Sequence, residues 1–159
     1  MRKIYGAKER QDGLYRIGRE KWELVYGFGK DREDDETGYN FRQRFSYRPT
    51  AEDCVEAVRE AINCKTAERI LRGLRWKGMQ VWLSKDNQLN YKTAYDLAVE
   101  SLGGPVRFKF GTDDAPQYHE FADLMELRDF HLAWTSHIAE SLAAGWAEKD
   151  AIDPRIFEV

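Results

Sequence analysis

The sequence predicts an α+β protein of three strand-strand-helix units, with antiparallel sheets and the helices on one face. The main observation is that the apolar residues change three times from a period of 2, typical of strands, to a period near 3.6, typical of helices. Aromatic residues, which favour strands, make up 13% of the chain. A chain of 159 residues is one domain or two small ones, and it is long enough to bury a core without disulfides or metal.

The first unit, residues 1–64, is expected to be an aromatic-rich β lobe followed by a helix. Apolar residues suggest a short strand at 14–17 and alternate along residues 22–28 and 39–47, which predicts two further strands. The charged run between the last two strands, residues 30–38, ends in glycine and predicts a solvated loop.

A helix from about residue 50 to 63 completes this unit. Thr50 is a typical N-cap, and Asp53 stands at the third helical position. Apolar residues then recur at helical spacing.

Residues 65–150 are expected to contain the other two units around one shared core. A strand from Ile70 turns at Lys77-Gly78 into a second strand, and Ser84 caps a helix whose apolar stripe reaches Leu102 and which Gly103-Gly104-Pro105 ends.

The third unit has a hairpin with its turn at residues 111–116, followed by a long helix over about 121–148. The helix has an apolar stripe with steps of three and four, namely Leu124, Leu127, Phe130, Trp134, Ile138, Leu142 and Trp146. Residues 151–159 are expected to be a loosely held tail.

No reactive constellation is recognisable. His131 and His137 lie six residues apart on one predicted helix, so they point to roughly opposite faces, and His119 belongs to a strand. Cys54 and Cys64 form no metal-ligand motif and are interpreted as small apolar residues. We therefore expect no catalytic residue, no metal and no cofactor, and we keep a small hydrolase with an unrecognised site as a minor alternative.

The charge is distributed unevenly. Residues 1–48 carry 12 basic and 9 acidic side chains, whereas residues 103–159 carry 5 and 11, and the chain as a whole has a net charge of -3. This asymmetry favours a head-to-tail contact between proteins over binding to nucleic acid. No apolar run is long enough for a membrane-spanning helix, and residues 1–9 have no signal-peptide pattern, so we expect neither a membrane partner nor secretion.

The first lobe has more aromatic side chains than it can bury, which predicts a partner surface. Residues 39–48 also permit an alternative, a module that stacks single-stranded nucleic acid on its rings, although core packing explains those rings more simply. The side chains predicted at an interface are Trp22, Tyr26, Phe28, Tyr39, Phe41, Arg42, Arg44, Phe45, Tyr47, Trp82 and Trp146.

The segment 69–91 resembles a phage and prophage domain of unknown function that is found in, or encoded beside, tail-fibre and tail-fibre-assembly proteins. The residues that carry the resemblance are Gly73, Trp76, Gly78, Leu83, Ser84, Asn87 and Gln88. It covers about residues 66–150 and implies a second hairpin and a long final helix, at whose cap position this chain has Glu120. Residues 1–50 look like the start of small prophage proteins from gut bacteria.

The resemblance implies a non-enzymatic tail, baseplate or tail-fibre accessory protein, or a chaperone for a tail fibre. Its partners would be other phage tail or fibre proteins, including copies of itself. Its location would be the virion or the host cytoplasm.

Overall fold

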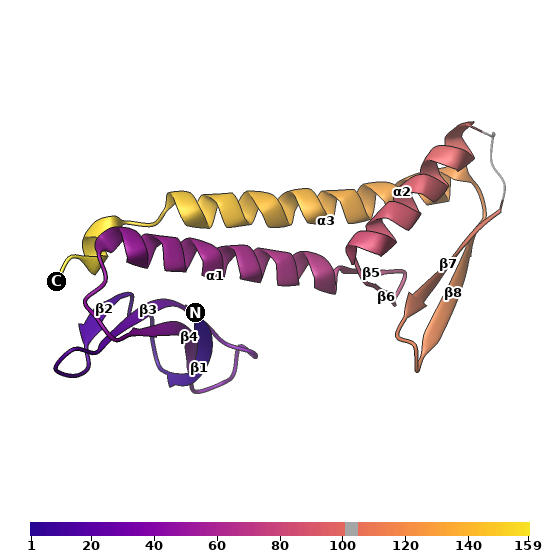
Figure 1. The fold of residues 1–159 in the computed structure, drawn as a ribbon. Coiled ribbons are helices and arrows are strands. Elements are labelled where there is room, and N and C mark those ends of the chain that lie inside the picture. Colours follow the sequence, from indigo (N-terminus) through magenta and orange to yellow (C-terminus); the bar gives the residue numbers. More distant parts are fainter. Residues whose placement is uncertain (101–104) are drawn as a thin grey trace. The chain divides into compact units, whose positions relative to one another are not determined.

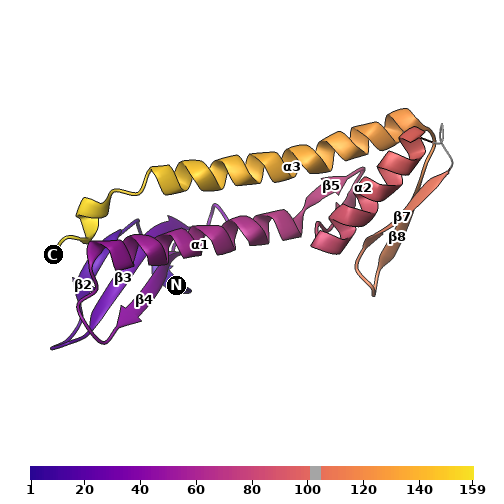
Figure 2. The same cartoon turned by 45° about the horizontal axis from the view of Figure 1, so that its top comes forward.

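The computed structural model describes residues 1–100 and 105–159 and confirms the α+β class with antiparallel sheets (Figures 1 and 2). The described residues form two compact units. The first contains residues 1–64 and 147–159, and the second contains residues 65–146.

The first unit contains a four-stranded antiparallel sheet with the strand order β1-β4-β3-β2. Its strands are β1 (Arg2–Ala7), β2 (Gly13–Arg16), β3 (Trp22–Gly29) and β4 (Gly38–Phe45). The sequence pattern missed β1, because this edge strand is exposed along nearly its whole length and so has no alternation of apolar and polar residues. The charged segment between β3 and β4 is a loop, as predicted.

A bulge bends β3 at Gly27, which has a φ of 69° that side-chain-bearing residues rarely adopt. Two side chains hold the bulge. The Gly27 amide donates to Oδ1 of Asp12 at 2.7 Å, and Nδ2 of the buried Asn40 donates to the Gly27 carbonyl oxygen at 2.7 Å. The glycines around Phe28 therefore belong to a strand irregularity.

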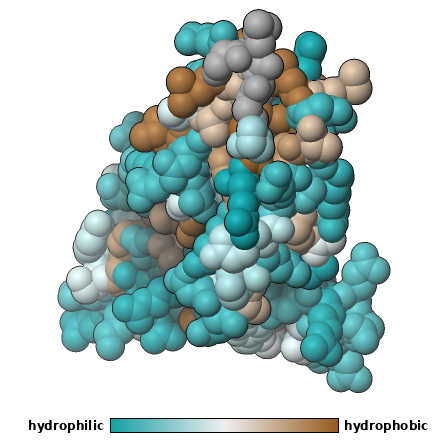
Figure 3. Space-filling model, turned by 90° about the vertical axis from the view of Figure 1, so that its right-hand side faces the viewer, coloured by the Kyte–Doolittle hydropathy of each residue, from teal (hydrophilic) through white to brown (hydrophobic). Residues whose placement is uncertain are grey.

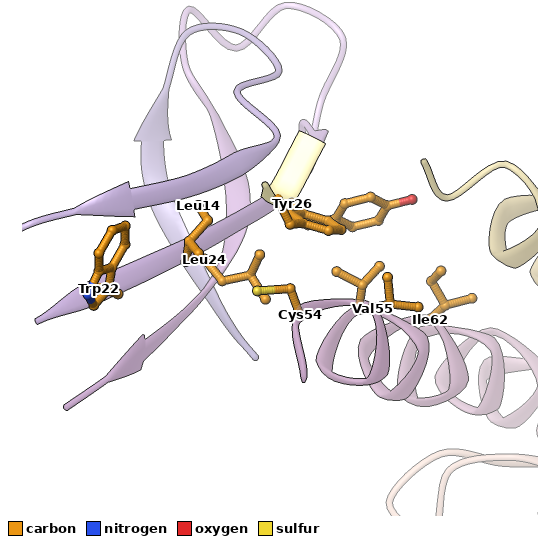
Figure 4. Packing of buried hydrophobic residues seen from close by; sticks show 9 residues of the cluster. Leu14, Trp22, Leu24, Tyr26, Cys54, Val55 and Ile62 are labelled. Carbon is orange, nitrogen blue, oxygen red and sulfur yellow. The ribbon is translucent and has the colours of Figure 1, made fainter. Parts of the chain in front are cut away.

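One face of this sheet packs against helix α1 (Ala51–Arg72). Figure 4 shows strand side chains such as Leu24 and Tyr26 directed toward Cys54, Val55 and Ile62 of the helix. Thr50 caps the helix, since the Asp53 amide donates to its Oγ1 at 3.1 Å.

The C-terminal residues are not the loose tail that the sequence suggested. They form a short 3-10 helix, η1 (Pro154–Phe157), which lies against β2. Phe157 is 2% exposed and belongs to the same core as Leu24 and Cys54. Asp153 caps η1 by accepting from the Arg155 amide at 3.0 Å.

Helix α1 is longer than predicted, and Ile70 is helical rather than part of a strand. No proline or glycine occurs between residues 63 and 72, so nothing in the chain stops the helix there. The helix ends at Gly73, whose φ is 64°, and the Gly73 amide donates to the Ile70 carbonyl at 2.9 Å.

The second unit contains two antiparallel hairpins and parts of three helices. The hairpins are β5 (Leu74–Trp76) with β6 (Met79–Val81), and β7 (Val106–Gly111) with β8 (Pro116–Phe121). Helix α2 spans Lys85–Glu100 and helix α3 spans Leu124–Asp150. The predicted end of α2 at Leu102, Gly103 and Gly104 lies outside the described residues.

One core joins both hairpins to α2 and α3. The ring of Tyr91 lies 5.2 Å from that of Phe130 and 4.8 Å from that of Phe108, with Phe121 and Trp134 in the same cluster. Burial among these rings raises the pKa of Tyr91 to about 12.

Along α3, the buried stripe departs from the predicted one in its second half. Leu127, Phe130 and Trp134 are buried, as predicted, but the later buried positions are the small residues Ser141 and Gly145. Trp146, by contrast, is 58% exposed.

Candidate interaction surface

The face of the four-stranded sheet opposite α1 carries an arginine–glutamate cluster. The register places Glu23 directly across from Arg44 and Val25 across from Arg42. Oε1 of Glu23 accepts from Nε of Arg44 at 2.9 Å, and Oε2 accepts from Nη1 of Arg42 at 3.2 Å. Glu23 is 9% exposed, so a nearly buried carboxylate lies between two guanidinium groups.

The same cluster lines a pocket of about 490 Å³, here called the outer-face pocket. Arg2 and Ile4 of the neighbouring strand β1 complete its wall, because Arg2 pairs with Arg42 in the sheet. Three arginines and one glutamate therefore line the pocket, together with Met1, Ile4 and Gln43. Arg44 has 77% of its side chain exposed, and Nε of Arg42 is buried with no hydrogen-bond partner.

A second pocket of about 470 Å³, here called the edge pocket, lies at another part of the first unit. Arg16, Arg19 and Arg48 line it together with Trp22 and Tyr47. The Arg48 guanidinium lies 5.5 Å from the centre of the Trp22 ring. Arg16 is held by the backbone, donating to the carbonyls of Gly18 at 3.1 Å and Arg19 at 2.8 Å.

The aromatic residues predicted at an interface of the first unit divide into three groups. Trp22 and Tyr26 are core residues with 9% and 5% exposure, so their assignment to an interface is corrected. The half-buried residues pack mainly on their neighbours, and they are Phe28, Tyr39, Phe41 and Phe45. Of the predicted rings of this unit, Tyr47 is exposed, at 54%.

These positions follow from the alternation of the strand. Tyr39, Phe41 and Phe45 alternate onto one face, on which Phe45 packs against the core that includes α1, whereas Arg42 and Arg44 fall on the outer face. The sequence pattern missed Glu23. The signal that identifies it is a glutamate inside an apolar strand that pairs with an arginine of the next strand.

In the second unit, the two predicted tryptophans are exposed. Trp82 is 38% exposed directly after β6, and Trp146 is 58% exposed on α3.

A further apolar surface lies where the end of α2 and the start of α3 are side by side in both cartoon views (Figures 1 and 2). It contains Val99, Leu124 and Met125, which are 46%, 39% and 74% exposed, and we call these three residues the apolar tip. Figure 3 shows hydrophobic surface gathered at the top of the view, over this part of the second unit. The sequence pattern assigned Leu124 to the core and did not consider the other two.

Several of the residues that carry the phage-domain resemblance form hydrogen bonds that shape the backbone. Oγ of Ser84 accepts from the Asn87 amide at 3.2 Å, which makes Ser84 the N-cap of α2. The side-chain amides of Asn87 and Gln88 then donate to the carbonyls of Trp82 at 3.0 Å and Leu83 at 2.7 Å. The motif thus fixes the passage from β6 into α2.

His119 contacts a carboxylate, that of Glu126, with 2.9 Å between Nε2 and Oε1. Glu126 also pairs with Lys77 and accepts from the Ala122 amide at 2.8 Å, while its own amide donates to Asp123 at 2.9 Å. The Lys77 hydrogen bond, followed by the Ala122 amide, lowers the pKa of Glu126 to about 2. Asp123 and Glu126 therefore cap α3, and the cap is Asp123 rather than Glu120.

The other histidines lie apart from this cap. His131 stacks on Tyr95 with 4.1 Å between ring centres, and burial lowers its pKa. Nε2 of His137 lies 3.1 Å from the Arg69 carbonyl oxygen.

The two cysteines have different environments. Cys54 is buried, and burial raises the pKa of its thiol to about 11. Cys64, by contrast, is exposed. Within residues 1–100 and 105–159, no group of three His, Cys, Asp or Glu side chains is placed to hold a metal ion.

Comparisons with protein-family models, curated proteins and solved structures give no match to this chain. Among the described residues, no helix has the length and apolar character needed to cross a membrane.

Proposed function

We propose that this protein is a non-enzymatic structural or assembly protein of a bacteriophage tail, as a tail, baseplate or tail-fibre accessory or chaperone. It acts through contacts with other tail or fibre proteins or with copies of itself. The observation that carries the proposal is the exposure of large apolar side chains in the second unit, above all Trp146 and Met125. Large apolar and aromatic side chains that remain outside a well-packed core mark contact surfaces between proteins.

The setting in a phage tail rests on the resemblance carried by residues 69–91. These residues hold a turn, a helix cap and a core, so they support a shared structural framework. The cluster of His119 and Glu126 suits a helix cap, because a carboxylate with a pKa of about 2 is a poor proton acceptor near neutral pH.

The proposal is tested in two steps. The genes on either side are first identified, and we expect tail or tail-fibre genes among them. Each neighbouring product is then co-expressed with the full chain, and we expect one of them to co-purify with it.

The variants Trp82→Ala and Trp146→Ala should reduce this co-purification at least tenfold without changing the circular dichroism spectrum. Tyr118→Ala, which removes another exposed ring of the same unit, is the matched control. A neighbourhood without tail genes, or variants that co-purify as well as the unmodified chain, would contradict the proposal.

A single-stranded nucleic-acid-binding module is the second candidate. The observation in its favour is the edge pocket, whose lining contains three arginines and the exposed ring of Tyr47, together with Glu20. Fluorescence anisotropy with a labelled dT12 strand at 50 mM NaCl tests it. This function requires saturable binding that Tyr47→Ala weakens about fivefold or more.

A further inference from the structure

We infer that the outer-face pocket of the first unit is a docking site for a carboxylate-bearing segment of a protein partner. The inference rests on the proposed function only in taking a protein as the occupant, and it concerns a different unit from the tryptophans discussed above.

Unbalanced charge is the first argument. Arg2, Arg42 and Arg44 carry three positive charges around the pocket, and Glu23 supplies one negative charge among the residues that line it. The two hydrogen bonds that Glu23 accepts from these arginines use one N–H group of Arg42 and one of Arg44. A guanidinium has five N–H donors in a planar fork, so donors remain on both arginines and on Arg2 for a second anionic group.

The position of Glu23 gives the second argument. Its carboxylate is almost buried and holds Arg44, which would otherwise be a flexible exposed side chain. Because this pairing limits the orientations of the two guanidinium groups before a ligand arrives, less conformational entropy is lost on binding. An ion pair around a nearly buried carboxylate adds little net stability, because the cost of desolvating the charges offsets their attraction, so stabilisation of the fold is a weak explanation for such an arrangement.

The lining also distinguishes a carboxylate from a nucleic acid. Among the described residues that line the outer-face pocket none is aromatic, and Ile4 supplies apolar surface instead. Stacking platforms for single strands need exposed rings. The glutamate would also repel a row of phosphates, whereas one or two carboxylates can share the guanidinium forks with it. An acidic side chain flanked by an apolar residue fits this wall best.

The test uses the full chain and a fluorescein-labelled hexaglutamate peptide, with labelled hexaglutamine as the neutral control, followed by anisotropy at 50 mM NaCl. We expect saturable binding of hexaglutamate that weakens at 300 mM NaCl, and none of hexaglutamine. Arg44→Gln should weaken binding about fivefold to tenfold. Arg128→Gln, which removes an exposed arginine of the second unit, should leave it unchanged.

Glu23→Gln gives an outcome of opposite sign. The substitution keeps the shape and one acceptor but removes the competing negative charge, so hexaglutamate should bind about threefold or more tightly. If this variant fails to fold, Arg2→Gln replaces it, with an expected loss of about threefold.

Three results would overturn the inference. The first is no binding at 50 mM NaCl, or equal binding by the Arg44 and Arg128 variants. The second is tighter binding of dT12 than of hexaglutamate that depends on Arg44, which would assign the pocket to nucleic acid. The third is self-association in sedimentation that Arg44→Gln abolishes, which would make a second copy the occupant. If this inference is wrong, co-purification through Trp82 and Trp146 is unaffected. The two proposals can therefore be contradicted independently of each other.

Discussion

Gly145 lies so close to Thr66 that a side chain at position 145 would collide with the Thr66 hydroxyl. The Thr66 Cβ itself is 3.5 Å from where a Cβ at position 145 would stand, which is ordinary contact. The close approach of α3 to this part of α1 therefore depends on the absence of a side chain at position 145.

Gly145→Ala should consequently destabilise the chain by about 1–2 kcal/mol, because the overpacking exceeds the gain in helix propensity. In a Thr66→Ala background the sign should reverse, since the colliding atoms are gone and alanine favours the helix by about 1 kcal/mol. A double-mutant cycle measured by urea unfolding tests this. Additive effects of the two substitutions would contradict the close contact.

Gly73→Ala should destabilise the chain much more than Gly78→Ala does. Both glycines have positive φ, which costs alanine about 1 kcal/mol. A Cβ at position 73 would also collide with the Val81 carbonyl oxygen, whereas one at position 78 meets no atom within 4 Å. We expect about 1 kcal/mol for Gly78→Ala and about 3 kcal/mol for Gly73→Ala. Equal melting temperatures of the two variants would contradict the close approach of Gly73 to the Val81 carbonyl oxygen at the end of α1.

Phe157→Ala should destabilise the first unit by about 3 kcal/mol or more, because it empties a fully buried position. Ile156→Ala is the adjacent control and should cost less than about 1 kcal/mol, since Ile156 is 38% exposed. Hydrogen exchange of amides in β2 and β3 provides the measurement. Unchanged exchange in the Phe157 variant would indicate that residues 151–159 are loosely held, and would contradict this prediction.

Acid should reduce the stability of the first turn of α3, because it protonates the Glu126 carboxylate. The pKa of this carboxyl is about 2 in the folded chain, below its ordinary value of 4.5. A carboxyl with a lowered pKa contributes stability above its unfolded pKa and loses that contribution as the pH falls, here from about 4.5 to about 2. Glu126→Gln should therefore reduce the loss of amide protection at residues 124–128 between pH 5.5 and pH 2.5.

Glu140→Gln is the control, since Glu140 is an exposed residue of the same helix. If the two glutamine variants respond to acid alike, the ion pair with Lys77 does not stabilise this cap.

Local features of the chain predicted most of the elements. The turn at Lys77-Gly78, the Ser84 cap and the strand β3 depend on neighbouring residues, and all three occur in the structure. Local signals failed at several elements, one of which is the C-terminal segment that was expected to be a loose tail and forms η1. The pattern missed the exposed edge strand β1, and it ended α1 before Gly73, where the chain first has a residue suited to stopping the helix.

The candidate site was predictable only in part. The period of β4 places Arg42 and Arg44 on one face, but their pairing with Glu23 depends on the register between two strands. Trp22 and Tyr26 of β3 are core residues rather than contact residues, because the face of the sheet that carries them packs against α1.

The sequence by itself determined the α+β class, the hairpin turns and the helix caps, because each depends on the local conformation of a few consecutive residues. Tertiary structure alone decided which members of an apolar stripe are buried. Trp134 and Trp146 both belong to the predicted stripe of α3, yet they are 5% and 58% exposed. Burial depends on what lies opposite, and in the described chain the hairpin aromatics and α2 cover Trp134, whereas Trp146 remains at the surface.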